Sequence, residues 1–271
     1  MTLAAGFKFE HPKAQGVSPI LLLSDSRYSY LRATPPHRDD GKKIIPLAAN
    51  IFAVFAGNVL EAQHALAKLK DGLALSTSGT FESLGEILKT SFDSAIATWD
   101  TQTPHCLLAG ISTKGNSKLF YAYPDAQSHG YAVSERLQAV IGIKDLEPRL
   151  QKIIDMRKPS GLYHPKHFMC RPDDMFLTDY DPKNQAILDA KEISFHISRV
   201  FLDIVEDPTV DGVNRPLQSV LLLPSGPISI ALYEIASSTQ ITRKTARANE
   251  VREEPDPSST SIAELNIRHS I

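Results

Sequence analysis

The feature that most constrains this fold is that strand-length apolar runs come in adjacent pairs joined by short polar turns. Residues 2–9 and 19–25 form one such pair, and residues 43–48 and 51–56 form another. Apolar or alternating runs of this length, bounded by turn residues, predict β-strands. Because the connections within each pair are short, we expect antiparallel hairpins.

Helical spacing of apolar residues interrupts the strands twice. It predicts helices over 59–73 and 80–99, and a second pair over 146–154 and 184–205. The remaining predicted strands cover 106–112, 118–123, 131–140, 217–223 and 228–233. Strand pairs separated by helix pairs are typical of an α+β protein, unlike the regular alternation of a parallel sheet. The order predicts a four-layer αββα sandwich, with helices outside two antiparallel sheets.

Composition limits the classes of protein to consider. The chain has 271 residues, 42% of them hydrophobic, and a formal net charge of −2. This charge argues against a protein that works mainly by clamping nucleic acid or an anionic membrane. Only two cysteines occur, Cys106 and Cys170, which fits a reducing cytoplasm. With no signal peptide and no apolar run of membrane-spanning length, we expect a cytoplasmic protein.

The hydrophobic pattern fades near residue 237, and the tail contains the stretch Pro255-Asp256-Pro257-Ser258-Ser259. Such a stretch cannot propagate a helix or a strand. We therefore expect one domain over 1–236 and a disordered tail over 237–271. A short recognition peptide within 262–271 is the alternative.

The first two residues, Met1 and Thr2, suggest a specific chemistry. Cytosolic aminopeptidase removes methionine when a small residue follows, so we expect Thr2 to become the N-terminus. Such a threonine carries a hydroxyl nucleophile and an α-amine whose unperturbed pKa is about 7.7–8.0. The amine can accept the hydroxyl proton near neutral pH, as in hydrolases that use an N-terminal threonine.

Four segments in order extend this suggestion. They read TLAAGFKF from Thr2, ILLLSDSR from Ile20, GKKIIPL from Gly41 and IFAVFAG from Ile51. Together they resemble the proteasome β-subunit and its bacterial relatives, densely over residues 2–75 and more loosely to about residue 235. The resemblance implies an N-terminal nucleophile (Ntn) hydrolase with the αββα fold.

The resemblance also implies roles for matching residues. Thr2 would be the nucleophile, Lys43 the lysine beside it and Asp25 the carboxylate that orients the lysine. Lys42 is the alternative to Lys43. The backbone N–H of Gly57 would form the oxyanion hole. Taken singly, these residues also fit an ion pair at a strand end, a solvated lysine and a simple turn.

The match has departures further along the chain. Asp207 aligns with a carboxylate that supports the N-terminal residue. Val210 and Ile143 stand where the family has supporting serines. Two insertions, 12–19 and 34–40, also differ from the family, and the second would border the substrate cleft. The departures affect residues around the nucleophile and leave the nucleophile and its lysine in place.

By the same matching, five residues would line a modest apolar substrate pocket. They are Tyr28, Ser29, Ile45, Phe55 and Val59.

Zinc-ligand residue types occur at His164, His167 and Cys170. Their spacing is not that of a recognised closed zinc site, and the surrounding loop is rich in proline and charge. We therefore expect a polar insertion loop there, and no metal or cofactor.

The resemblance implies a threonine endopeptidase in a homo-oligomeric ring that encloses its peptide or protein substrate. The sequence has no Gly-rich phosphate loop, so energy for unfolding substrates would come from a separate ATPase or adaptor. Two alternatives stay open. One is a non-catalytic scaffold subunit of a similar ring, and the other is an Ntn amidase that acts on a small amide.

Overall fold

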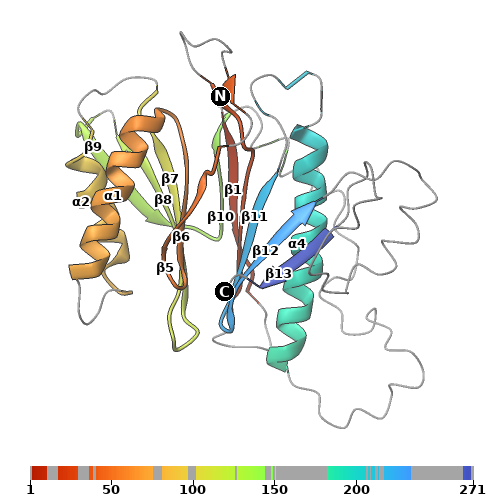
Figure 1. Cartoon of the computed structure of the whole chain (residues 1–271). Coiled ribbons are helices and arrows are strands. Elements are labelled where there is room, and N and C mark those ends of the chain that lie inside the picture. Colours follow the sequence, from red (N-terminus) through yellow and green to blue (C-terminus); the bar gives the residue numbers. More distant parts are fainter. Residues whose placement is uncertain are drawn as a thin grey trace, which may run out of the picture.

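The computed structural model describes most of the first 143 residues and a C-terminal part of the domain. The described residues are 2–10, 18–29, 37–38, 41–75, 81–96, 102–125, 127–143, 148, 150, 182–205, 207, 209–210, 213, 217–232 and 265–269. They form an α+β protein built on two antiparallel sheets (Figure 1).

The first sheet contains the N-terminal strand and has the order β10-β1-β2-β11-β12-β13. Its strands are β1 (Leu3–Lys8), β2 (Ile20–Ser24), β10 (Gln138–Gly142), β11 (Gln218–Leu223), β12 (Gly226–Leu232) and β13 (Leu265–His269). All five neighbouring pairs are antiparallel. The predicted hairpin of the first two strands is therefore confirmed.

Strand β13 lies within the stretch expected to be a disordered tail. Its five residues pair with β12, with Ile267 opposite Ile230. The rest of 237–271 lies outside the described residues, so the domain boundary at residue 236 stays a prediction.

The second sheet has the order β5-β6-β7-β8-β9. Its strands are β5 (Ile44–Ala48), β6 (Ile51–Ala56), β7 (His105–Ile111), β8 (Ser117–Asp125) and β9 (Gly130–Glu135). Neighbouring strands in this sheet are consecutive strands of the chain and pair antiparallel. Short turns join β5 to β6, β7 to β8 and β8 to β9, whereas the connection from β6 to β7 carries two helices. A separate ribbon, which the sequence pattern did not predict, pairs β3 (Tyr28–Ser29) with β4 (His37–Arg38).

One predicted strand, 131–140, is wrong as a single element. The structure divides it into β9 of the second sheet and β10 of the first. Between them, the Arg136 N–H donates to Leu119 O and the Leu137 carbonyl accepts from the Lys8 N–H. The chain thus bends at Leu137 as it passes from one sheet to the other, without a Gly or Pro, so the residue pattern gives no sign of the switch.

The described helices are α1 (Val59–Leu75), α2 (Leu84–Asp93) and α4 (Pro182–Val205). Helix α2 is shorter than the predicted 80–99. At its end the Phe92 carbonyl accepts hydrogen bonds from the N–H groups of both Ala95, three residues on, and Ile96, four residues on. Ala95 and Ile96 remain buried beyond the helix, which explains why the apolar pattern runs past its end. Most of the predicted helix 146–154 lies outside the described residues.

Three apolar clusters hold these elements together. One joins α4 to a face of β1, β2 and β11, another joins α1 and α2 to a face of the second sheet, and the third contains residues of both sheets. Strand β2 shows the alternation, since Leu21 and Leu23 belong to the α4 cluster while Ile20 and Leu22 belong to the cluster shared by the sheets. A strand covered on both faces needs apolar residues on both, and residues 20–23 of β2 supply them.

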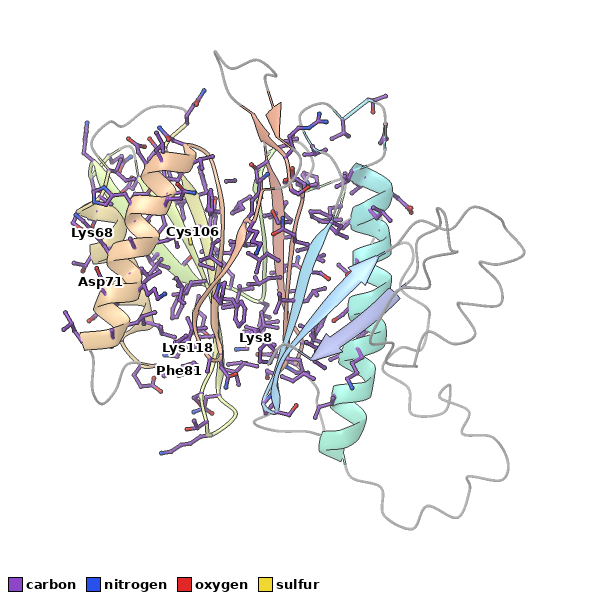
Figure 2. The ribbon with its side chains drawn as sticks, viewed as in Figure 1. Lys8, Lys68, Asp71, Phe81, Cys106 and Lys118 are labelled. Atoms are coloured by element: carbon purple, nitrogen blue, oxygen red, sulfur yellow. The ribbon has the colours of Figure 1, made fainter. Side chains whose placement is uncertain are left out.

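The cysteine Cys106 on β7 lies in the cluster beneath α1 and α2 (Figure 2). Burial raises the pKa of its thiol far above the ordinary range. A thiol that stays protonated is a poor nucleophile and metal ligand, so Cys106 acts as a small apolar core residue. Among the helices that the structure describes, none is long and apolar enough to cross a membrane.

Truncation of Leu22 tests the cluster shared by the sheets. Leu22 is fully buried, so we expect Leu22→Ala to lower the free energy of unfolding by about 2–5 kcal/mol. The matched control is Leu60→Ala, since Leu60 is 77% exposed and the change should stay within about 0.5 kcal/mol. Urea unfolding of both variants measures the difference, and equal stabilities would contradict this assignment of the core.

Candidate active site

A buried ion pair joins the ends of two strands from different sheets. Lys43 directly precedes β5, and Asp25 directly follows β2. The Lys43 Nζ lies 2.9 Å from Asp25 Oδ1, and both side chains are fully buried. Isolated charges are very costly in such a setting, so each one requires the other.

Main-chain donors hold the Asp25 carboxylate in place. Its Oδ1 accepts from the Leu3 N–H at 2.9 Å, and its Oδ2 accepts from the Arg27 N–H at 2.9 Å. Burial raises the pKa of Asp25, while the Lys43 ammonium and these two N–H groups oppose the rise. The carboxylate is thus fixed to the strand that begins directly after Thr2.

The same ammonium reaches the predicted nucleophile. Lys43 Nζ donates to Thr2 Oγ1 at 3.0 Å, and Thr2 is partly buried. A neighbouring cation favours the deprotonated form of a hydroxyl. The structure therefore brings Thr2, Lys43 and Asp25 into one chain of contacts, whereas Lys42 is exposed.

Gly57 follows β6 in a conformation that favours glycine. Its φ is +114°, and a Cβ there would lie 2.7 Å from Gln102 O and 2.8 Å from Pro104 Cα. The residue is exposed, so its backbone is open to approach from solvent. An oxyanion donor requires an N–H that a substrate can approach.

Gly142 belongs to the corner formed by Thr2, Asp25, Lys43 and Gly57, although no role was predicted for it from the sequence. Its φ is +106°, and a Cβ there would lie 1.7 Å from the Thr2 carbonyl oxygen and 3.5 Å from Ala56 Cβ. Thr2 and Ala56, which precedes Gly57, therefore both lie close to the position that a side chain on this glycine would take. A glycine at the end of a strand was the only sequence signal for this close approach.

The described contacts of Asp207 Oδ1 are local. It accepts from the Thr209 N–H at 2.8 Å and from Thr209 Oγ1 at 2.6 Å, which closes a turn after α4. Ile143 and Val210, for which the resemblance implies supporting serines, pack against the α4 cluster that also contains Leu3. A supporting role for Asp207 beside Thr2 stays a prediction.

Three of the residues expected to line the substrate pocket lie in one place. Phe55 is buried in the cluster beneath α1, and Ile45 and Val59 pack against this cluster while partly exposed. For Tyr28 and Ser29 the structure describes the backbone, which pairs with β4. Their part in a pocket stays a prediction.

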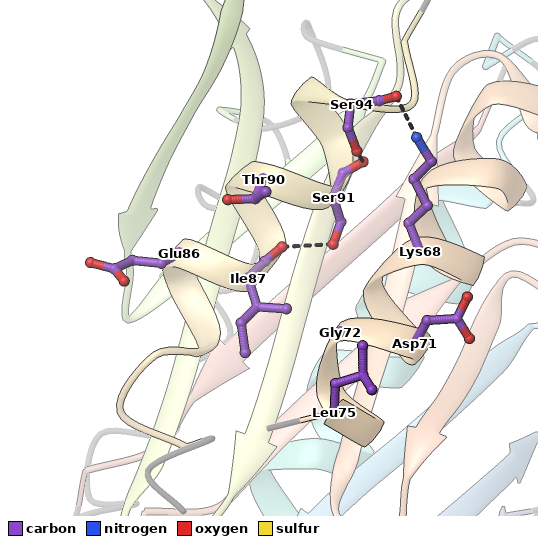
Figure 3. Close-up of a pocket in the computed structure, with 9 residues that line it drawn as sticks. All are labelled: Lys68, Asp71, Gly72, Leu75, Glu86, Ile87, Thr90, Ser91 and Ser94. Carbon is purple, nitrogen blue, oxygen red and sulfur yellow. Dashed lines mark hydrogen bonds between the residues drawn. The ribbon is translucent and has the colours of Figure 1, made fainter. Parts of the chain in front are cut away.

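A cavity of about 510 Å³ lies elsewhere, between α1 and α2 (Figure 3). Lys68 Nζ closes one end by donating to the Ser94 carbonyl at 2.5 Å, and Ile87 and Leu75 supply apolar lining. None of the predicted site residues lines this cavity, so it is separate from the corner at Thr2.

No group of His, Cys, Asp and Glu in the described ranges is arranged to hold a metal ion. The zinc-ligand types His164, His167 and Cys170 lie outside those ranges.

Removal of the buried ammonium tests the ion pair. Lys43→Met leaves Asp25 buried without its cation, so we expect the free energy of unfolding to fall by about 3–5 kcal/mol in urea titrations. Adding Asp25→Asn should recover part of the loss, because it removes the unpaired carboxylate. The control Lys42→Met should change stability by about 0.5 kcal/mol or less, since Lys42 is exposed. A Lys43→Met variant as stable as this control would show that the pair is not a buried one.

A pair of glycine variants separates backbone strain from close packing. Gly226 has a φ of +124°, and a Cβ added there would have no atom within 4 Å, so Gly226→Ala should cost only about 1–2 kcal/mol of strain. Gly57→Ala should cost the same strain plus about 1–3 kcal/mol for its contacts with Gln102 and Pro104. Thermal or urea unfolding gives both costs, and equal values would show that Gly57 has room for a side chain.

Comparison with known proteins adds no family to this geometry. A scan against protein-family models finds none that matches the chain, and no curated protein is significantly similar to it in sequence.

Proposed function

We propose that this protein is an N-terminal nucleophile hydrolase of the proteasome type, which cleaves amide bonds with Thr2. The observation that carries the proposal is the chain of contacts from Thr2 Oγ1 through Lys43 Nζ to the buried Asp25. A lysine buried this completely needs a reason beyond stability, since an apolar pair would cost less desolvation. A cation held beside a hydroxyl is one such reason.

The arrangement of the elements supports the same proposal. Helices α1 and α2 cover one sheet, α4 covers the other, and a third cluster lies between the sheets. We interpret this arrangement as the four-layer αββα sandwich of Ntn hydrolases. The nucleophile then lies at the start of β1, where that fold places it.

The reaction would proceed through an acyl-enzyme. With Met1 removed, the Thr2 amine takes the hydroxyl proton as Oγ1 attacks the substrate carbonyl carbon, while Lys43 stabilises the developing negative charge on Oγ1. The oxyanion of the tetrahedral intermediate accepts a hydrogen bond from the Gly57 N–H. The C–N bond breaks as the leaving amine takes the proton back, and water then hydrolyses the ester on Thr2.

The proposed substrate is a peptide or protein, cleaved inside a homo-oligomeric ring. A separate ATPase or adaptor would unfold substrates for this ring. A small amide is the alternative substrate. Activity on small amides alone, in an assembly that is not a ring, would favour it.

A second candidate is a non-catalytic scaffold subunit. It is favoured by Ile143 and Val210, which place apolar side chains where supporting hydroxyls are expected and pack against the α4 cluster. Without those hydroxyls, the N-terminal amine has fewer partners to orient it.

Intact-mass measurement with an epoxyketone, a covalent inhibitor directed at N-terminal threonine, separates the two candidates. We expect the purified full chain to lack Met1 and to gain one inhibitor adduct. Thr2→Ala should gain none, because it lacks the hydroxyl, and Thr2→Ser should react more slowly than the parent. Retained Met1 with no adduct would overturn the peptidase proposal and favour the scaffold.

A further inference from the structure

The Lys43 side chain is held at its ammonium by Asp25, and its backbone is held separately. Gln218, the first residue of β11, lies opposite Ser24 in the register of the first sheet, one residue from Asp25. Its side chain reaches the segment that leads into β5 of the second sheet. Two neighbouring strands of one sheet therefore hold the two ends of the same lysine.

The contacts of Gln218 use both halves of its amide. Its Oε1 accepts from the Lys43 N–H at 2.9 Å and from the Ile44 N–H at 3.3 Å, and its Nε2 donates to the Gly41 carbonyl. Gly41 also donates its own N–H to the Ser26 carbonyl at 3.0 Å. The chain from residue 41 to 44 is thus tied to the sheet that carries Thr2.

We propose that Gln218 is a positioning residue, which sets where Lys43 Nζ stands relative to Thr2 Oγ1; this inference rests on the proposed function. Asp25 alone fixes the far end of a flexible side chain, and the position of the Lys43 Cα depends on the path of residues 41–44. Gln218 fixes that path from three main-chain atoms. A glutamine is suited to this task because one side chain supplies both an acceptor and a donor.

We expect Gln218 to affect the chemical step, which is the attack by Thr2. Gln218 contacts the main chain of residues 41–44, at the opposite end of Lys43 from its ammonium. It therefore acts on Thr2 through that lysine. Its loss should misplace the ammonium and slow attack by Thr2, with little effect on how tightly an inhibitor first binds. Misplacement of a catalytic group by about 1 Å can lower a rate by roughly 100-fold.

The test compares Gln218→Met, which keeps side-chain length and loses all three hydrogen bonds, with Gln63→Met on the exposed face of α1. Epoxyketone labelling of the full chain gives the maximal inactivation rate and the inhibitor binding constant separately. For Gln218→Met we expect the rate to fall roughly 10- to 100-fold while the binding constant changes by less than about twofold. Gln63→Met should match the parent in both.

Hydrogen exchange supplies a readout that does not depend on activity. The amides of Lys43 and Ile44 should lose protection in Gln218→Met, because they lose their acceptor. Should this variant not fold, Gln218→Glu keeps the acceptor and loses the donor to Gly41, and we expect a smaller fall in the inactivation rate.

The outcomes separate the two proposals. A parent protein that does not label overturns the proposed function, whatever Gln218 does. A parent that labels, with a folded Gln218→Met that labels at the parent rate, overturns the positioning role alone. Lost amide protection without a slower inactivation rate would also overturn it, since the backbone would then have moved with no effect on Thr2.

Discussion

The buried contact between Lys43 and Asp25 is the interaction on which the rest of the corner depends. Two opposite charges with no exposure to water come from strands in different sheets. Each is stable there only while the other is in reach, so the pair fixes how these two strand ends meet. The hydroxyl of the partly buried Thr2 then has a fully buried cation 3.0 Å away.

The corner is assembled almost entirely at strand ends. Thr2 precedes β1, Asp25 follows β2, Lys43 precedes β5 and Gly57 follows β6. Strand ends are where polar side chains can leave a sheet while the strand interiors stay apolar. Gly142, at the end of β10, lets the Thr2 carbonyl approach too closely for any side chain, and Ala56 lies against the same glycine.

A strand or helix was predicted correctly where its local residue pattern matched the place that it takes in the tertiary structure. The hairpins of β1 with β2 and of β5 with β6 were predicted because short turns leave little choice of partner. The strand predicted over 131–140 failed because the chain passes from one sheet to the other at Arg136 and Leu137, neither of which is a turn residue. Helix α2 was predicted too long because apolar residues beyond its end are buried in the same cluster.

The sequence by itself determined the alternation of strand pairs and helices, and it placed Thr2, Asp25 and Lys43 at the ends of apolar runs. These are local properties, set by residue periodicity and turn chemistry. Only the tertiary structure decided that Lys43 rather than Lys42 meets Asp25, and that Gly142 and Gln218 belong to the same corner. These relations join the ends of different strands, some of them far apart in the chain, and packing between two sheets creates them without leaving a pattern in the sequence.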